Sequence, residues 1–215
     1  MCEDDDINAK GILLGGTNVA DPDTGKRMDR RMGVALHETK MICGYAGLGH
    51  ALDEIIAFGD MVIDNVRSIT TGIRPGTSPS TGDVMYELAD NEITLGAGGH
   101  GEAGAVNIPM CTSRELAEYL LDMIIKDKPF VPGDELSFIV NGTGGTTMME
   151  LLIFYNDCWD ILEERGFKVF KPIVGTLSTI QESSGIVLDV CKMANDDMKK
   201  TWTMPTDCTA FPRTW

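Results

Sequence analysis

The stretch that decides the fold class reads ELSFIVNGTGGTTMME over residues 135–150. Its first part, Glu135–Val140, is rich in β-branched and aromatic side chains, which predicts a buried strand. The glycines of Asn141–Gly145 predict a sharp turn after that strand. Thr147 and Glu150 then form a capping box, a pattern typical of the start of a helix. A strand joined to a helix in this way indicates a domain in which sheet and helices pack together.

Strands and helices alternate on both sides of this stretch. The expected strands are Met85–Leu88, Glu92–Leu95, Glu135–Val140, Val169–Thr176 and Ile186–Met193. The expected helices are two within Asp29–Ile69 separated by the glycines at 44, 47 and 49, one after a second capping box at Thr112–Glu115, one from Thr147 to Gly166, and a short one over Asp196–Trp202. We therefore expect an α/β (α+β) fold, with a mixed β-sheet covered by helices and a helical N-terminal segment.

The start of the chain differs in composition from the rest. Residues 1–28 include the acidic run Glu3–Asp6 and the segment Gly11–Arg27, where glycines and a proline stand among small polar residues. This composition predicts an acidic, flexible arm. Residues 29–215 are expected to form one lobe, and no internal repeat is evident.

The overall composition excludes several classes of function. The chain has 215 residues and a net charge of -15, which argues against binding to nucleic acid or to an anionic membrane surface. The acidic N-terminus does not resemble a signal peptide, and no apolar run is long enough to span a bilayer. Six cysteines without a C-x-x-C pair argue against a zinc site and indicate free thiols in a reducing cytoplasm.

His100 is the most notable candidate for chemistry. It lies in a run with five glycines among the nine residues from Gly96 to Gly104. Glycine allows positive φ angles and lets a ligand approach the backbone closely. Ordering such a run costs conformational entropy, which needs a reason. Composition alone leaves two interpretations open, a ligand-binding loop and a tight turn with an ordinary surface histidine.

The other candidates have simpler interpretations. Asn141–Gly145 lies between a strand and a helix, where backbone N–H groups can bind an anion, but it lacks the lysine and the spacing of a P-loop, and a plain turn is favoured. Asp90–Glu92 is interpreted as a polar turn. His37 and His50 are assigned structural or surface roles, and three histidines without a repeated spacing to carboxylates predict no metal site.

The glycine run forms part of a longer motif. Leu88–Glu92, Leu95–Gly96 and Gly98–Gly104 resemble the signature of the substrate-binding subunit of dihydroxyacetone kinases, which reads approximately L-x-D-N-E-x-E-x-G-x-G-I-H-G-E-P-G. The resemblance continues at Asp4–Asp6, Asn65, Arg67–Ser68, Asn141–Thr146, Glu150–Leu151 and Ser183–Gly185. It covers nearly this whole chain, but only about the C-terminal two-thirds of the family protein.

The resemblance implies a role for His100. In that family the histidine of the signature forms a hemiaminal with the carbonyl carbon of the substrate, and His100 stands at its position. A neutral imidazole is a competent nucleophile near pH 7. The loop residues Gly98, Gly99, Gly101 and Glu102 are expected to bind the substrate, a short ketose such as dihydroxyacetone. No metal ligand is expected among them.

The chain departs from the family pattern in three places. Gly99 replaces an isoleucine and Ala103 replaces a proline, which leaves the identity of the ketose open. The family's N-terminal region, with its Gly-Gly-Gly-Ser-Gly-His loop and catalytic aspartate, has no counterpart. Because Met1 and Trp215 look like natural ends, we expect a split-gene subunit that is not active alone.

The resemblance also implies partners. We expect a companion chain equivalent to the missing half, and no cofactor on this chain. The phosphoryl donor, ATP or ADP with Mg²⁺ or a phosphocarrier, is expected on a partner subunit of a cytoplasmic oligomer. The alternatives are a non-catalytic ligand sensor or coactivator with the same fold, or a degenerate remnant without function.

Overall fold

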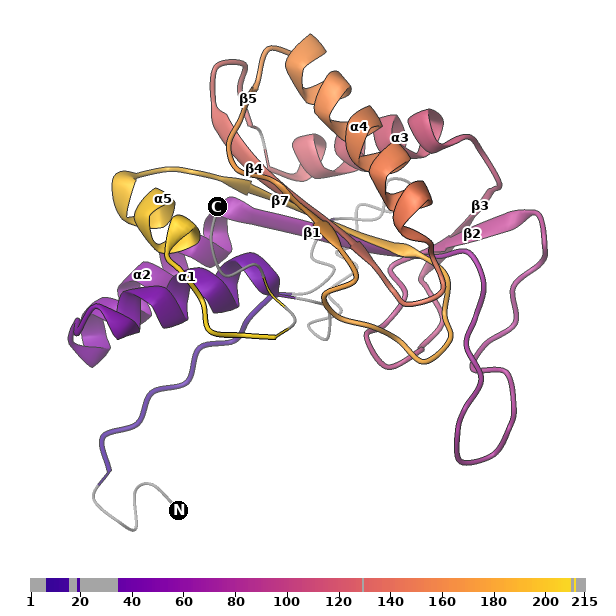
Figure 1. Ribbon diagram of the computed structural model, residues 1–215, viewed down its shortest axis with the longest axis horizontal. Helices are drawn as coiled ribbons and strands as arrows, with labels where there is room; N and C mark the ends of the chain where they lie inside the picture. Colours follow the sequence, from indigo (N-terminus) through magenta and orange to yellow (C-terminus); the bar gives the residue numbers. More distant parts are fainter. Residues whose placement is uncertain (1–6, 16–18, 20–34, 129, 210, 212–215) are drawn as a thin grey trace.

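The computed structural model describes residues 7–15, 19, 35–128, 130–209 and 211. Figure 1 shows a twisted sheet with helices packed against both of its faces. This arrangement confirms the expected mixed α/β fold with a helical segment before the first strand. Most of the expected arm, residues 1–28, lies outside the described residues.

The sheet has seven strands in the order β3-β2-β1-β7-β4-β5, and β6 also pairs with β4. The strands are β1 Val66–Gly72, β2 Glu92–Leu95, β3 Val106–Pro109, β4 Glu135–Gly142, β5 Lys168–Val169, β6 Ile173–Gly175 and β7 Ile186–Lys192. The short strands β5 and β6 run parallel to β4, and all other pairs are antiparallel. The central strand β7 is therefore hydrogen-bonded along both edges.

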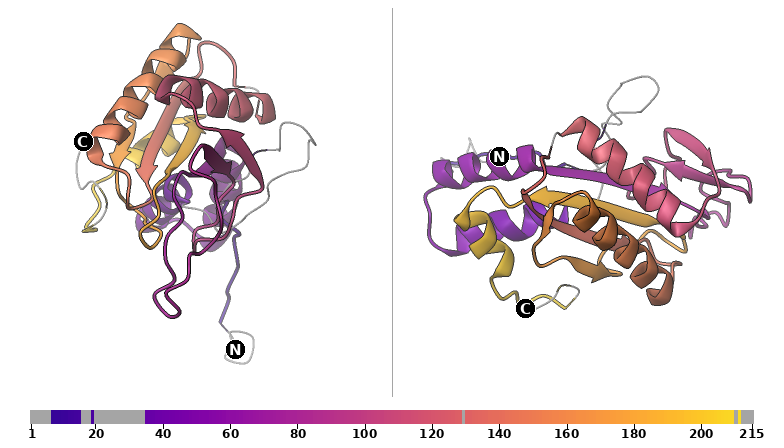
Figure 2. Two further views of the ribbon diagram at one scale, coloured as in Figure 1. Left: turned by 90° about the vertical axis from the view of Figure 1, so that its right-hand side faces the viewer. Right: turned by 90° about the horizontal axis from the view of Figure 1, so that it is seen from above.

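Five helices cover this sheet. They are α1 Leu36–Gly47, α2 Leu52–Asn65, α3 Ser113–Asp127, α4 Met148–Glu164 and α5 Asp196–Thr203. Figures 1 and 2 show α3 and α4 together on one face, with α1, α2 and α5 on the other side. Alternate residues of β4 follow this division, since Phe138 packs in the core beneath α3 and α4 while Ile139 packs in the core beneath α1, α2 and α5.

Both predicted capping boxes are present. The Thr112 side chain accepts a hydrogen bond from the backbone N–H of Glu115, whose own side chain returns to the Thr112 backbone. Thr147 and Glu150 do the same at the start of α4. Each pair satisfies two N–H groups that a helix N-terminus otherwise leaves without partners.

The predicted helical range Asp29–Ile69 is wrong at its C-terminal end, because α2 ends at Asn65 and β1 begins at Val66 without a connecting loop. Every residue of β1 is buried, so the strand has no alternation of polar and apolar residues to reveal it. Arg67 stabilises this junction, since its guanidinium donates to the carbonyl oxygens of Asp64 at 3.2 Å and Val66 at 2.7 Å.

Two other predicted elements need correction. Met85–Leu88 is not a strand, because β2 pairs with β1 and with an unpredicted strand, β3, on its other side. The turn at residues 89–91 therefore leads from a long loop into β2. The predicted strand Val169–Thr176 is two short strands, β5 and β6. They are interrupted at Pro172, which has no N–H to donate, and at Lys171, whose φ is 44°.

A buried polar cluster lies between α1 and the sheet. Glu38 is 2% exposed, Asp189 is 1% exposed, and Asp189 is paired across the β1–β7 ladder with Ser68. Burial raises the pKa of Glu38 to about 7. Burial and the neighbouring Glu38 charge raise the pKa of Asp189 well above its usual value. His37 lies in the same layer, where its Nε2 is 3.2 Å from Ser137 Oγ and burial lowers its pKa to about 3.

Arg67 also makes a buried ion pair that we expect to be important for stability. Its Nε lies 2.5 Å from Asp127 Oδ2 at the end of α3, and the two side chains are only 8% and 9% exposed. Removing one partner of a buried pair leaves a desolvated charge. Arg67→Met should lower the free energy of unfolding by about 3 kcal/mol, measured by urea denaturation. Arg114→Met, which removes exposed pairs with Glu118 and Glu164, should cost less than about 1 kcal/mol. Equal losses in the two variants would contradict this assignment.

The carboxyl pair predicts an unusual dependence of stability on pH. Because the pKa of Glu38 is raised to about 7, the folded chain keeps a proton that the unfolded chain loses above its ordinary pKa. The free energy of unfolding should therefore fall, by an amount on the order of 2 kcal/mol, as pH rises from 5 to 7. Glu38→Gln should make this slope shallower in urea titrations across pH 5–8, because only Asp189 then contributes, whereas the exposed control Glu118→Gln should keep it. An unchanged slope in Glu38→Gln would rule out this origin.

Candidate functional site

His100 lies at the tip of the loop that connects β2 to β3. The loop begins where Gly96 N donates to Thr70 O at 2.7 Å and ends where Ala105 N donates to Leu95 O at 2.7 Å. Within it, Gly101 N donates to Gly98 O at 3.2 Å, which closes a tight turn. The His100 side chain is 73% exposed, so its ring is open to solvent and to a ligand.

Steric contacts explain why two positions of this turn are glycine. Gly101 has a φ of +91°, and a Cβ atom there would lie 2.0 Å from Met85 Sδ. A Cβ atom on Gly98 would lie 2.0 Å from Glu102 Oε2. Neither position can hold a larger residue without displacing its neighbour. The contact with Gly101 also gives the Met85 side chain a role, because it supports the His100 turn from the neighbouring loop.

Glu102 holds the turn from the other side. Its Oε2 accepts a hydrogen bond from the backbone N–H of His100 at 3.1 Å, and its Oε1 lies 3.8 Å from His100 Nδ1. Its backbone carbonyl accepts from Gly98 N at 3.0 Å. The structure thus brings His100 together with Gly98, Gly101 and Glu102, and Gly99 lies within the same turn. Their roles toward a substrate remain predictions.

The predicted turn Asn141–Gly145 begins later in the structure, because β4 continues to Gly142, and the polar groups of this segment are used within the protein. Thr143 N donates to Gly185 O at 3.1 Å, and Gly145 N donates to Ser183 O at 2.8 Å. The buried Asn141 side chain accepts from the backbone N–H groups of Leu177 and Ser178 and donates to Ser178 O. The arrangement favours the structural interpretation of this turn over an anion site.

A hydrogen-bonded hub at Ser183–Gly185 connects the loops at this end of the sheet. Ser184 O accepts from Ile73 N at 2.7 Å and from Arg74 N at 3.1 Å, in the loop that leads to Met85. Gly185 O and Ser183 O accept from the Asn141–Gly145 turn. The His100 turn is thus linked to Asn141–Gly145 through two intermediate loops. Sequence reasoning noted Ser183–Gly185 only as part of a resemblance and missed this hub.

The other predicted histidines lie elsewhere. His37 is a fully buried residue of α1, and its ring centroid lies 4.5 Å from that of Trp202 with the two rings tilted by 33°. His50 lies between α1 and α2, where it stacks on Tyr45 at 3.7 Å. Both agree with the structural or surface roles assigned to them. Asp90 and Asn91 form a polar turn before β2, in which Glu92 N donates to Ala89 O at 3.0 Å, but the predicted strand on its other side is absent.

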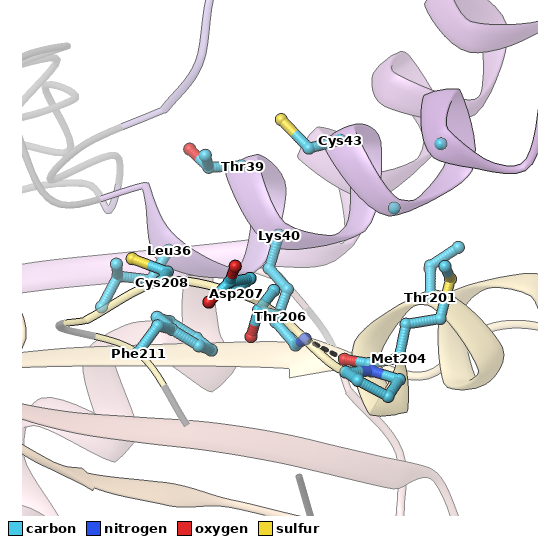
Figure 3. Close-up of a pocket in the computed structure, with 13 residues that line it drawn as sticks. Leu36, Thr39, Lys40, Cys43, Thr201, Met204, Thr206, Asp207, Cys208 and Phe211 are labelled. Atoms are coloured by element: carbon cyan, nitrogen blue, oxygen red, sulfur yellow. Dashed lines mark hydrogen bonds between the residues drawn. The ribbon is translucent and has the colours of Figure 1, made fainter. Parts of the chain in front are cut away.

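A pocket of about 460 Å³ lies between α1 and the C-terminal segment (Figure 3). Mostly apolar side chains line it, including Leu36, Met204 and Phe211. The Lys40 ammonium group lies at its edge and donates to Met204 O at 2.6 Å. This pocket does not include His100, so it is not the site that the motif predicts.

Within the described part of the chain, no group of three or more His, Cys, Asp or Glu side chains could hold a metal ion. None of the helices in that same part is long and apolar enough to cross a membrane.

Comparison with known proteins identifies relatives of this chain. Residues 1–210 match the model of the Dak1 domain. The dihydroxyacetone-binding subunit DhaK of a PTS-dependent dihydroxyacetone kinase from Listeria innocua is 30% identical over 211 residues, which are 98% of this chain and 64% of that protein. The L-erythrulose kinase of Pectobacterium atrosepticum is 28% identical over 95% of this chain and 36% of that protein. This chain thus spans less than two thirds of the length of these relatives.

Solved structures show the same fold. A protein described as the dihydroxyacetone kinase operon co-activator Dha-DhaQ superposes with a TM-score of 0.88 at 24% identity, over 99% of this chain and 66% of that one. The dihydroxyacetone kinase of C. freundii superposes with a TM-score of 0.82 at 19% identity, over 99% of this chain and 38% of that one. The family match extends over nearly the whole sequence and includes the His100 turn, and we conclude that this chain belongs to the Dak1 domain family.

Proposed function

We propose that this chain is the substrate-holding part of a dihydroxyacetone-type kinase and that His100 captures a short ketose as a hemiaminal. The observation that carries the proposal is the His100 turn. An exposed imidazole stands on a glycine turn that packing against Met85 and a hydrogen bond to Glu102 hold in place. The printed names of relatives, dihydroxyacetone-binding subunits and erythrulose kinases, support short ketoses as the substrate class.

The proposed capture is an addition to the ketose carbonyl group. An imidazole nitrogen of His100 forms a bond to the carbonyl carbon as the carbon–oxygen π bond breaks. The oxygen takes up a proton and becomes a hydroxyl group, while the other ring nitrogen releases its proton, so the product is neutral. Covalent attachment fixes the orientation of the ketose, and a correctly held hydroxyl group is the main requirement for phosphoryl transfer.

The phosphoryl donor is proposed to bind on another subunit. The N–H groups of Thr143 and Gly145 donate within the chain, and Glu150 caps the start of α4. These positions would otherwise suit a phosphate group.

The five described cysteines are unpaired thiols, which supports a reducing cytoplasm as the place of action.

A companion chain is proposed to complete the site. This chain spans 64% of its Listeria relative, and His100 is exposed rather than enclosed. Binding sites for small molecules usually bury most of the ligand, so further walls are needed.

A ligand sensor or coactivator is the second candidate function. The observation that favours it is the same exposed His100, which could capture a ketose without any phosphoryl transfer. The two candidates share the capture step and differ in turnover. Reconstitution with the other subunits therefore separates them.

The capture step can be tested with dihydroxyacetone labelled with ¹³C at its carbonyl carbon. In the complex of this chain with its companion, the labelled carbon should move from the ketone to the tetrahedral region of the NMR spectrum, because the carbonyl becomes a hemiaminal. His100→Ala should abolish this signal, whereas the control His50→Ala should keep it. Ketose binding by His100→Ala as tight as by the parent would show that His100 has no covalent role.

Dependence on the companion can be tested by reconstitution. This chain with the donor subunit alone should give no ketose phosphate in a coupled assay, because the general base for the substrate hydroxyl is proposed to come from the companion. Such a base contributes roughly 10²–10⁴-fold in rate. Adding the companion should restore turnover. Full turnover without it would overturn the split-enzyme proposal, and capture without turnover in the complete mixture would favour the sensor.

A further inference from the structure

The Glu102 carboxylate occupies an unusual position relative to His100. It reaches back two residues along the chain, and its Oε2 accepts the His100 backbone N–H at 3.1 Å. The same oxygen lies over the α-carbon of Gly98, where a Cβ atom would come within 2.0 Å. The other oxygen, Oε1, is thereby directed to the ring side of the turn, 3.8 Å from Nδ1.

This position bears on which nitrogen of the ring carries the proton. A neutral imidazole has one N–H donor and one nitrogen with a free lone pair, and its partners decide which is which. A carboxylate beside Nδ1 stabilises the form with hydrogen on Nδ1, as acidic partners of functional histidines commonly do. The lone pair is then on Nε2. At 3.8 Å the two atoms are within ion-pair distance and beyond hydrogen-bond distance, so the negative charge of the carboxylate is what favours hydrogen on Nδ1.

We infer that Glu102 is a positioning residue that fixes the His100 turn and selects the tautomer in which Nε2 is the nucleophile. This inference rests on the proposed function of His100. During capture Nε2 forms the bond to the carbonyl carbon, and the ring carries a positive charge until Nδ1 releases its proton. The Glu102 carboxylate stabilises that charge and accepts or relays the Nδ1 proton, while solvent protonates the carbonyl oxygen.

The inference also explains why position 98 is a glycine. A side chain at position 98 would displace the carboxylate without changing the charge of the site. Gly98→Ala and Glu102→Gln should therefore produce the same defect by different routes. One removes the space for the carboxylate, and the other removes its charge.

The tautomer can be measured directly in the full chain without ketose. The sequence has three histidines, so ¹H–¹⁵N NMR of the imidazole nitrogens is tractable, and His100→Ala assigns the relevant signals. In the parent, His100 should carry its proton on Nδ1. In Glu102→Gln and Gly98→Ala it should shift toward the Nε2-protonated form, and Glu102→Asp should restore part of the parent pattern. The control is Glu92→Gln, which removes an equal charge on β2 and should leave His100 unchanged.

The capture reaction gives a second readout. The rate of hemiaminal formation should fall about two- to fivefold in Glu102→Gln, since a partly exposed charge pair contributes modestly. If His100 has the same tautomer in the parent and in Glu102→Gln, the inference is overturned even where capture occurs. If the tautomer shifts but the parent forms no adduct with labelled dihydroxyacetone, the proposed function fails while the positioning by Glu102 stands.

Discussion

The loops at the functional end of the sheet depend on the backbone carbonyl groups of Ser183–Gly185. These three carbonyls accept hydrogen bonds from the loop after β1 and from the turn after β4, so two segments about 70 residues apart in the chain are joined to a third. Backbone N–H groups in loops have no partner in the sheet and need such acceptors, because burying an unpaired N–H group costs about as much free energy as losing a hydrogen bond. The His100 turn is supported indirectly, since Met85 belongs to one of the joined loops.

Much of this fold is visible in the sequence because its signals are local. The capping boxes at Thr112 and Thr147, the strands β4 and β7, and the turn at Asn141–Gly145 each depend on residues within a few positions of one another. Two strands gave no such signal. β1 is buried on both faces and follows a helix directly, and β3 is an edge strand that ends in Pro109. Edge strands tolerate proline and half-exposed residues, so their sequences resemble loops.

The site was predictable to a similar degree. The motif placed His100 among its glycines, and the structure adds the steric reason for Gly98 and Gly101. Partnerships across long distances in the sequence could not be foreseen. Glu38 and Asp189 are 151 positions apart and meet only because α1 packs over the β1–β7 ladder. In the same way, Met85 was expected in a strand, and its contact with Gly101 follows from the fold of a long loop.

The central place of β7 has a consequence for how the chain is made. During synthesis from the N-terminus, β1 and β4 leave the ribosome long before the strand that pairs with both of them. Until Ile186–Lys192 has been translated, their inner edges present unpaired backbone groups flanked by apolar side chains. Such edges invite pairing with other chains. The nascent protein is therefore most vulnerable to aggregation, and most exposed to chaperones, in the period after β4 has been made and before β7 is made.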